Sequence, residues 1–466
     1  MLTRKIRKVR PTGEHSQPHG QTARQDVPRR VMPVEGARMT PMPRTPISLS
    51  DARLQAALAA GRAAALASRL AGKGSGASIR GQVMMKVDPQ ALGKLLAHRR
   101  IAAVTGTNGK TTTTHLLAAA VREGTPEPAR RVVTNADGAN LYHGVASALG
   151  EAAKADIAIL ETDERIVPRI IEEGRPEVLV LLNFSRDQMD RNHEIKSLGR
   201  GWRVALEKAG EAGPVVVANA CDPLTTWAAE TAKQVIWIDT GAGWTQDAAL
   251  CPACGAVLAH VDGHWDCPAC PLTQPEADYT VHGEEVTEKD GTVWTLDLQV
   301  PGRFNRANAA CALAAARVMG IEPDVALKGM HSVTSPAGRY AVATFGDVKG
   351  RLMLSKNPAG WAESLPLAAT DPVVLAIDAV AADGKDVSWL WDVDYEQLAG
   401  RHVICTGPRA LDLAVRLTYG EVEHEVVPDL SAAMARAGEL ADEGVVIDVL
   451  STYTPFQKLR KLGGLA

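Results

Sequence analysis

The sequence predicts an α/β fold, because short apolar segments of strand length alternate with segments of helical periodicity along most of its 466 residues. One stretch of this alternation begins near residue 98 and a second fills the C-terminal third. Two distinctive motifs lie within the first stretch: a glycine turn at Val104–Thr113 and a cluster of four cysteines after residue 250. The length suggests about three domains.

The elements of the first domain follow from its apolar runs. We expect a helix at 50–71, a flexible turn at 72–81 and a short strand at 83–87. Helices are expected at 111–122 and 198–209, between strands at 101–105, 131–134, 156–161, 177–183 and 214–218. This order predicts a parallel sheet covered by helices, with ligands at the carboxyl ends of the strands, where Thr105, Glu161 and Asn183 fall.

The glycine turn has the composition of a phosphate-binding loop. Gly106 and Gly109 would let backbone N–H groups approach an anion, and Lys110 would supply a charge for the β- and γ-phosphates. Val104 stands where the general motif has a glycine, but the preceding strand and following helix favour a phosphate cradle over an ordinary turn. We therefore expect ATP to be bound by Thr107, Asn108, Gly109, Lys110, Thr111 and Thr112.

Acidic residues end the strand expected at 156–161, in the run 156–164. Glu161 is the best placed of them to reach Mg²⁺ opposite the phosphate loop, where Thr111 would offer its hydroxyl. The alternative is a solvated acidic loop at the strand end.

Four cysteines form two knuckles of the pattern Cys-Pro-Ala-Cys, separated by twelve residues. This spacing predicts a zinc ribbon over 248–273, held by Cys251, Cys254, Cys267 and Cys270. A closed site of four thiolates has no position for a substrate, so the zinc is expected to be structural; an iron–sulfur centre is the remote alternative. Cys221, Cys311 and Cys405 are scattered in apolar stretches, which indicates a reducing cytoplasm rather than a disulfide framework.

A second α/β domain is expected at 335–466, from strands at 342–345, 351–354, 373–378, 402–406 and 445–450 and helices at 409–419 and 430–441. Residues 1–48 carry ten Lys or Arg against three acids and few large apolar residues, so we expect a disordered basic tail. No apolar run is long enough to cross a bilayer. A net charge of −3 gives no reason to expect a nucleic-acid partner.

Several of these motifs stand in the order in which they occur in the Mur ligase superfamily, ATP-dependent enzymes that activate carboxylates. Besides the loop TGTNGKT, they are the segment 181–191, the turn 219–223, the helix start 302–308 and the pair Gly338–Arg339. The resemblance implies a Mur-ligase-like central P-loop ATPase domain over 49–330 and a Rossmann-like C-terminal domain. It places Asn305 near the adenine and Arg339 on the phosphates. Gln188 stands where that family has a metal-binding histidine.

The cysteine ribbon, the segment 134–140 and the segment DVSWLWD at 386–392 resemble one branch of this superfamily, the MurT synthetase subunits of lipid II isoglutaminyl synthase. The resemblance implies ATP-dependent activation of the D-glutamate α-carboxylate in the lipid II stem peptide, followed by attack of ammonia to give D-isoglutamine. Residues on the substrate side would be Asn135, Asn140, Asn183 and Asp187. The implied place of action is the cytoplasm, at the inner face of the membrane that carries lipid II.

A source of ammonia is the remaining requirement, and the sequence shows no convincing Cys–His glutaminase site. The resemblance implies a heterodimer with a glutaminase of the GatD type, whose Cys–His pair would be completed by Asp386, preferred here over Asp383 and Asp392. The alternative is that Trp389 and Trp391 bury against the sheet while these acids face solvent. Competing functions are an amino-acid-adding Mur ligase, a folylpolyglutamate synthetase and a non-catalytic scaffold switched by nucleotide.

Overall fold

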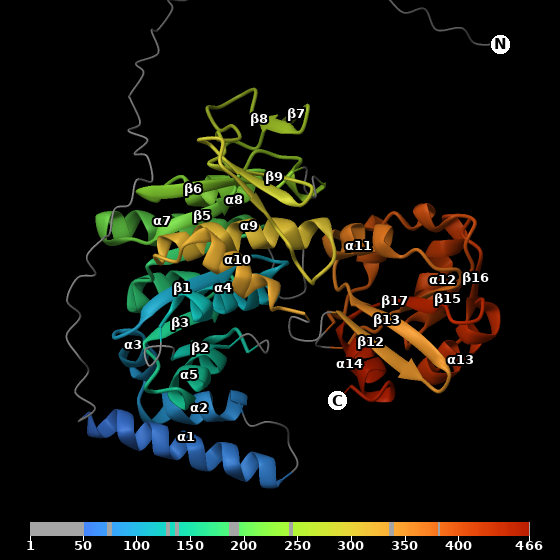
Figure 1. Cartoon of the computed structure of the whole chain (residues 1–466), viewed down its shortest axis with the longest axis horizontal. Helices are drawn as coiled ribbons and strands as arrows, with labels where there is room; N and C mark the ends of the chain where they lie inside the picture. The colour runs from blue at the N-terminus through green and yellow to red at the C-terminus, as the bar shows by residue number, and fades with distance from the viewer. Residues whose placement is uncertain are drawn as a thin grey trace, which may run out of the picture. The chain divides into compact units, whose positions relative to one another are not determined.

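The computed structural model describes residues 51–71, 77–126, 131–135, 139–185, 195–241, 246–334, 340–380 and 383–465. The expected basic tail at 1–48 lies outside these residues, as do Asp187, Gln188 and Arg339. The described chain forms a nine-stranded sheet, a six-stranded sheet and a two-stranded ribbon (Figure 1). The predicted α/β class is therefore correct. None of the described helices is long and apolar enough to cross a membrane.

The nine-stranded sheet of the central domain has the order β11-β10-β9-β6-β5-β4-β1-β3-β2. Its strands from β6 to β2 pair in parallel, whereas β9, β10 and β11 form an antiparallel meander that joins the sheet through a parallel β6–β9 pair. The bounds are β1 Arg100–Thr105, β2 Val132–Thr134, β3 Ile157–Glu161, β4 Val178–Leu181, β5 Val215–Asn219, β6 Gln234–Asp239, β9 Tyr279–His282, β10 Glu285–Glu288 and β11 Val293–Thr295. The five predicted strands are β1 to β5, and neither β6 nor the meander was predicted.

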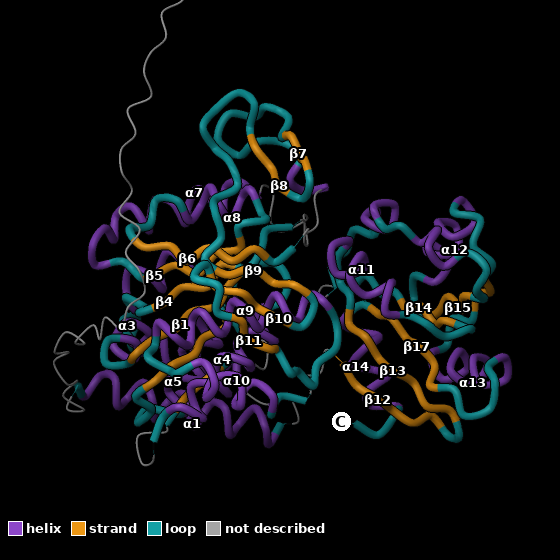
Figure 2. Tube along the Cα trace, turned by 45° about the horizontal axis from the view of Figure 1, so that its top comes forward, coloured by secondary structure: helices purple, strands orange, loops and turns teal. Residues whose placement is uncertain are grey.

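Helices cover both faces of this sheet (Figure 2). Alternation along β1 sends Ala102 and Val104 to one face and Ile101 and Ala103 to the other. The first face packs against α4 (Lys110–Gly124), α9 (Arg303–Val318) and α10 (Pro323–His331). The second packs against α1 (Ala52–Leu70), α2 (Ala77–Val87), α3 (Ala91–Leu96), α5 (Tyr142–Glu151), α6 (Val167–Arg169), α7 (Ile195–Ala209) and α8 (Pro223–Ala229).

The strand expected at 83–87 is wrong, because these residues belong to α2. Met84 is fully buried between α1 and α5, and glycines on both helices make room for it. A Cβ atom at Gly61 would lie 2.5 Å from Met84 Cγ, and one at Gly150 would lie 2.7 Å from its Cε. The apolar run 83–87 alone resembles a strand. It is helical because α2 packs closely against α1 and α5. The expected turn is also shorter, since α2 begins at Ala77.

The cysteine ribbon consists of the antiparallel pair β7 (Ala259–Val261) and β8 (His264–Asp266), with one cysteine knuckle before and one after it. Asp262 and Gly263 form the tight turn between the strands, both with positive φ. Leu258, Trp265 and Leu272 fill a small core beside the cysteines.

The C-terminal domain is built on a six-stranded sheet of order β12-β13-β17-β14-β15-β16, in which only β12 is antiparallel to its neighbour. Its bounds are β12 Tyr340–Phe345, β13 Val348–Leu354, β14 Val373–Ala376, β15 Val403–Thr406, β16 His424–Val426 and β17 Val446–Ser451. The helices are α11 Pro358–Ser364, α12 Ala410–Tyr419, α13 Leu430–Leu440 and α14 Tyr453–Leu462. All five strands and both helices predicted here are present; β16, α11 and α14 were not predicted.

Candidate nucleotide and metal sites

The glycine loop connects β1 to α4 at the edge of the sheet where β4, β1 and β3 end side by side. Gly106 and Gly109 have φ values of 137° and 85°, which side chains other than glycine rarely adopt. At Gly109 a Cβ atom would lie 2.4 Å from Asn308 Oδ1 of α9. Two glycines are therefore required for the loop to take this path beneath α9.

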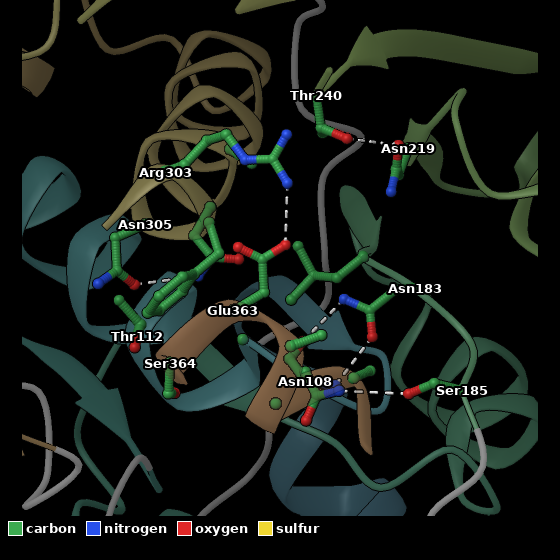
Figure 3. Close-up of a pocket in the computed structure, with 18 of the residues that line it drawn as sticks. Asn108, Thr112, Asn183, Ser185, Asn219, Thr240, Arg303, Asn305, Glu363 and Ser364 are labelled. Carbon is green, nitrogen blue, oxygen red and sulfur yellow. Dashed lines mark hydrogen bonds and ion pairs between the residues drawn. The ribbon is translucent and has the colours of Figure 1, made fainter. Parts of the chain in front are cut away.

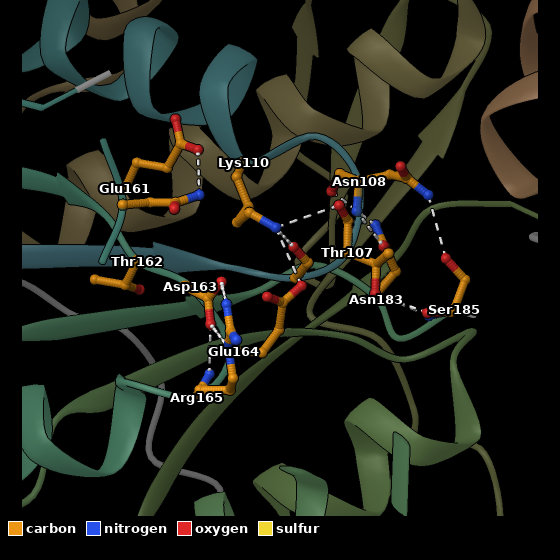
Figure 4. Close-up of polar contacts among 12 residues, drawn as sticks. Thr107, Asn108, Lys110, Glu161, Thr162, Asp163, Glu164, Arg165, Asn183 and Ser185 are labelled. Carbon is orange, nitrogen blue, oxygen red and sulfur yellow. Dashed lines mark hydrogen bonds and ion pairs between the residues drawn. The ribbon is translucent and has the colours of Figure 1, made fainter. Parts of the chain in front are cut away.

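The segment after β4 holds the loop in place (Figure 4). The Asn183 side chain accepts a hydrogen bond from the Asn108 backbone N–H at 2.9 Å and donates one to the Asn108 carbonyl at 3.1 Å. The Thr107 hydroxyl accepts from the Ser185 N–H at 3.0 Å and donates to the Ser185 carbonyl at 3.2 Å. These reciprocal pairs fix the loop before any ligand arrives, so little ordering entropy remains to be lost on binding.

Lys110 is buried at the start of α4 and turned toward an acid. Its ammonium donates to Glu164 Oε1 at 3.1 Å and also contacts the carbonyls of Gly106 and Thr107 (Figure 4). The two side chains are 6% and 11% exposed, so the pair is largely shielded from water. Removing either charge would leave the other buried without a partner, which is strongly destabilising. A phosphate that enters the loop would replace Glu164 as the partner of this ammonium.

The two groups expected to hold Mg²⁺ meet directly. The Thr111 hydroxyl donates to Glu161 Oε2 at 2.8 Å, and the carboxylate is 1% exposed. Asn140 donates to Glu161 Oε1 at 3.0 Å, while Asn135 bonds both the N–H and the carbonyl of Glu161. A hydroxyl and a carboxylate are oxygen ligands of the kind that Mg²⁺ prefers, so the donor set fits the ion. Asn135 and Asn140 act here on Glu161.

A cavity of about 410 Å³ opens beside the loop, within the size range of small-molecule sites. It is lined by Asn108, Gly109 and Thr112 of the loop and α4, by Asn305 and Asn308 of α9, and by residues of β5, β13 and α11 (Figure 3). Asn108 exchanges two side-chain hydrogen bonds with Asn357, which caps α11, and Arg303 pairs with Glu363 at 3.1 Å. Both α/β domains therefore supply walls of this cavity.

The turn that follows β5 lines the same cavity through Asn219, Cys221 and Asp222. Asp222 caps α8 by accepting from the backbone of Leu224 and Thr225, and accepts from the Phe184 N–H at 2.7 Å. Burial raises the pKa of Asp222 to about 6, against the opposing effect of these bonds. One carboxylate thus ties the turn to the segment that clamps the phosphate loop.

The four cysteines of the ribbon converge as their spacing predicts. Their sulfur atoms all lie within 4.8 Å of one another, with Cys251 and Cys270 at 3.6 Å and Cys254 and Cys267 at 3.4 Å. Tetrahedral zinc with bonds of about 2.3 Å needs sulfurs about 3.8 Å apart, so the cluster is close to the required geometry. The residues fit a closed structural metal site, at which zinc would cross-link the two knuckles.

Replacing Cys251 with serine should destabilise the ribbon rather than remove chemistry selectively. We expect bound zinc to be lost and the unfolding midpoint to fall by about 5 °C or more, because metal binding contributes folding free energy. Zinc content and thermal unfolding measure this. As a control, Cys405→Ala removes an equally buried cysteine of the C-terminal domain and should leave zinc content unchanged. A folded, fully active and zinc-free Cys251→Ser protein would contradict a structural metal.

The cysteines outside the ribbon are unsuited to nucleophilic catalysis. Burial raises the pKa of Cys221, Cys311 and Cys405 to about 12 each, so their thiolates are scarce at neutral pH. Cys221 also donates to Asp239 at 3.0 Å. None of the described groups around these cysteines activates a thiol.

The acids of the segment 383–392 differ in their surroundings. Asp386 is exposed and accepts from the Ser388 N–H at 2.8 Å, which lowers the pKa of its carboxyl. Asp383 is 3% exposed and accepts from the Thr454 N–H at the start of α14. Asp392 is half-buried at the end of the 3₁₀ turn Ser388–Asp392. Of the three, Asp386 presents a charged carboxylate to solvent.

Several residues of the site were not singled out from the sequence. Glu164 was seen only as part of an acidic run, and Asn308 only as the end of a motif. Asn357 lies more than 240 residues from its partner Asn108, and Glu363 lies more than 50 residues from its partner Arg303. No local sequence pattern could have paired them. An Asn-Pro step before a short helix is the one signal, since it predicts the cap that Asn357 forms.

Comparison with known proteins identifies the class. Residues 104–316 match the Mur ligase middle domain. The fold is similar to that of a pseudomurein peptide ligase type C from Methanothermus fervidus, with a TM-score of 0.60, 17% identity and 78% of each chain covered. The protein has the Mur ligase fold, and this family implies ATP as a cosubstrate.

Three further matches identify the branch of the superfamily. Residues 354–456 match the MurT ligase C-terminal family. A Staphylococcus aureus protein named lipid II isoglutaminyl synthase (glutamine-hydrolyzing) subunit MurT is 30% identical over 420 residues, 83% of this chain and 92% of that one. The Streptococcus pneumoniae protein of the same name is 28% identical over 84% of this chain. The chain belongs to the MurT family.

Proposed function

We propose that this protein is the synthetase subunit of a glutamine-dependent lipid II amidating enzyme in peptidoglycan synthesis. ATP would phosphorylate the α-carboxylate of the D-glutamate residue in the stem peptide, and ammonia would displace phosphate from the acyl phosphate to give D-isoglutamine. The carrying observation is the buried constellation of Lys110, Thr111 and Glu161 on a preformed loop, within a chain that aligns with MurT subunits over most of its length.

The residues of the loop take complementary roles in this proposal. Backbone N–H groups of 109–112, at the start of α4, would receive the phosphates, and Lys110 would offset charge on the transferred group. Asn135 and Asn140 orient Glu161, so that the carboxylate and the Thr111 hydroxyl face one ion. Mg²⁺, when bound there, would supply charge neutralisation at the phosphates. Asn305 and the adjoining cavity would receive the adenosine, and Arg339 and Asp187, outside the described residues, remain candidates for phosphate and substrate.

Closure between the two domains is the proposed means of excluding water from the acyl phosphate. Asn357 of the C-terminal domain bonds Asn108 of the loop, and Glu363 bonds Arg303. These contacts place α11 against the cavity, where it would shield an intermediate that water hydrolyses.

The direct test supplies purified protein with lipid II, ATP and Mg²⁺, and adds ammonium or glutamine with a glutaminase subunit. Amidated lipid II formed from ammonium alone supports the synthetase role. Exclusive use of an amino acid would favour the amino-acid-adding alternative, and use of a folate substrate would favour the folylpolyglutamate alternative. Nucleotide binding without product from any acceptor would favour the scaffold alternative. Mass spectrometry of the lipid separates these outcomes.

A separate glutaminase subunit of the GatD type is the proposed nitrogen source. Two observations support it: the relatives are named as subunits of a glutamine-hydrolysing synthase, and the three cysteines outside the ribbon are deactivated by burial. Asp386 would enter the partner's active site, orient its histidine and stabilise the charged imidazole. The depressed pKa and exposure of Asp386 suit that role.

An apolar surface that includes Trp391, in the segment 386–392 that begins with this aspartate, suits the docking of that subunit. Leu411, Val415 and Tyr419 lie four residues apart on α12 and are 70%, 51% and 75% exposed, and Trp391, 53% exposed, stacks edge-on against Tyr419 with ring centroids 5.3 Å apart. We call these four residues the α12 patch. Helix faces turned to solvent are usually polar. Trp391 belongs to the same short segment as Asp386, so one partner can cover the patch and receive the aspartate.

Replacing Tyr419 with serine should weaken the complex with the glutaminase by about tenfold or more, because exposed aromatic anchors contribute strongly to interfaces. Glutamine-driven amidation at low subunit concentration should fall in step, and ammonium-driven amidation should not. Titration of the labelled glutaminase measures the affinity. The control Leu70→Ser changes an equally exposed apolar residue of α1 and should bind normally. Unchanged binding by Tyr419→Ser would refute the patch, and self-association abolished by it would assign the patch to a second copy.

A further inference from the structure

The cysteine ribbon is bonded to a turn of the nucleotide cavity. Trp265 of β8 is 2% exposed, and its indole N–H donates to the Ala220 carbonyl at 3.0 Å. Gln274, just beyond the second knuckle, contacts Cys221 Sγ at 3.9 Å and holds the Trp265 backbone. Ala220 belongs to the turn 219–222, whose other three residues, Asn219, Cys221 and Asp222, line the cavity.

The turn 219–222 is also bonded to the segment 183–185, which holds the phosphate loop and which we call the clamp. Asn219 accepts from the Cys221 N–H at 2.9 Å and from the Thr240 hydroxyl at 3.0 Å, which sets the shape of the turn (Figure 3). Asp222 then accepts from Phe184 N–H, between the two residues that clamp Asn108 and Thr107. A continuous set of hydrogen bonds therefore runs from ribbon to turn, from turn to clamp and from clamp to loop.

We propose that the ribbon positions the nucleotide cavity, with Trp265 and Gln274 as positioning residues that couple the metal-bound ribbon to nucleotide affinity. This proposal rests on the proposed binding of ATP in the cavity and adds a role for the metal site. Trp265 packs in one small core with Cys251 and Cys267, so loss of the metal would release the tryptophan. The Ala220 carbonyl would then keep only its weaker contact with the Thr226 hydroxyl, at 3.3 Å.

Coupling between the metal site and the nucleotide cavity must be reciprocal. The same coupling free energy can therefore be measured from nucleotide affinity and from metal release. If the folded ribbon favours nucleotide binding, bound nucleotide must favour the metal-bound ribbon by the same factor. Saturating ADP should therefore slow the transfer of zinc to a chelator in the full-length protein. A ribbon that merely folds beside the cavity would release zinc at one rate with and without ADP.

The variant Trp265→Phe keeps the aromatic packing and removes the indole donor. We expect the dissociation constant for ADP, measured by calorimetry, to rise by about three- to tenfold, while zinc content and unfolding midpoint stay close to wild type. Chelating the zinc should weaken ADP binding more in wild type than in the variant, because the contact that transmits the effect is already missing. The control Trp294→Phe, on β11, removes an indole hydrogen bond to Glu288 of β10, outside the cavity lining, and should bind ADP normally.

A second variant keeps the proposal testable if Trp265→Phe loses its zinc. Gln274→Ala leaves the ribbon core intact and removes only the contacts with Cys221 and the Trp265 backbone; we expect about a two- to threefold loss of ADP affinity. If the zinc-loaded variants bind ADP and release zinc as the wild-type protein does, the proposal is overturned and the proposed function is unaffected. Failure of the wild-type protein to bind ADP would overturn both.

Discussion

Lys110→Ala should abolish lipid II amidation with either nitrogen source, by about 10³-fold or more. The ammonium is buried on the phosphate loop, where it would stabilise charge on the transferred phosphoryl group in a nearly dry site. Because acyl phosphate formation precedes use of nitrogen, ammonium cannot bypass the defect. Product formation measured with ammonium, and separately with glutamine and the glutaminase, tests this.

The substitution also leaves Glu164 without its buried partner, so the fold of the variant has to be checked by thermal unfolding. A double change, Lys110→Ala with Glu164→Gln, removes the uncompensated charge and should recover stability without recovering activity. Lys328→Ala, an exposed lysine paired with Glu123, is the matched control and should retain activity. Appreciable ammonium-driven amidation by a folded Lys110→Ala protein would remove the lysine from the phosphate site.

Asp386→Asn should separate the two nitrogen sources. Glutamine-driven amidation should fall by about 10³- to 10⁴-fold, because an amide cannot hold the partner's histidine in its charged form. Ammonium-driven amidation should be retained, since Asp386 bonds to Ser388 and does not line the nucleotide cavity. Parallel assays with the two nitrogen sources provide the measurement.

Asp392→Asn is the control for this prediction, being an acid at the far end of the same short segment. It should keep glutamine-driven activity. Equal loss with both nitrogen sources in Asp386→Asn would refute the proposed role, and selective loss in Asp392→Asn would move that role to the neighbouring acid. Complex formation by Asp386→Asn should be unchanged, because the α12 patch remains intact.

The elements that sequence predicted best are those buried on both faces. β1, β3 and β4 are continuous apolar runs because helices cover both sides of the central sheet, and such runs are easily recognised. The meander β9–β11 has three- and four-residue strands with exposed positions, so its pattern is weak. The strand expected at 83–87 failed for a different reason: the apolar run is used in a three-helix contact around Met84.

The site divides in the same way. Loop residues 106–112 and the four cysteines carry their chemistry in local spacing, so the sequence identified them. The roles of Asn135, Asn140 and Asn183 required the structure, because each acts through a residue 21 to 75 positions away. These three asparagines were expected to contact the substrate, and in the structure they bond to the phosphate loop or to Glu161. Their contacts with the substrate stay a prediction.

By itself the sequence determined the α/β class, the glycine-loop motif, the four-cysteine motif and the superfamily. The first three depend on residues close together in the chain, and the superfamily depends on the order of such local motifs. Only the tertiary structure decided that Glu164 neutralises Lys110, that the ribbon bonds to the nucleotide cavity, and that α12 presents an apolar face. These features depend on which distant side chains meet in a low-dielectric interior and which remain at the surface, and that is settled by packing.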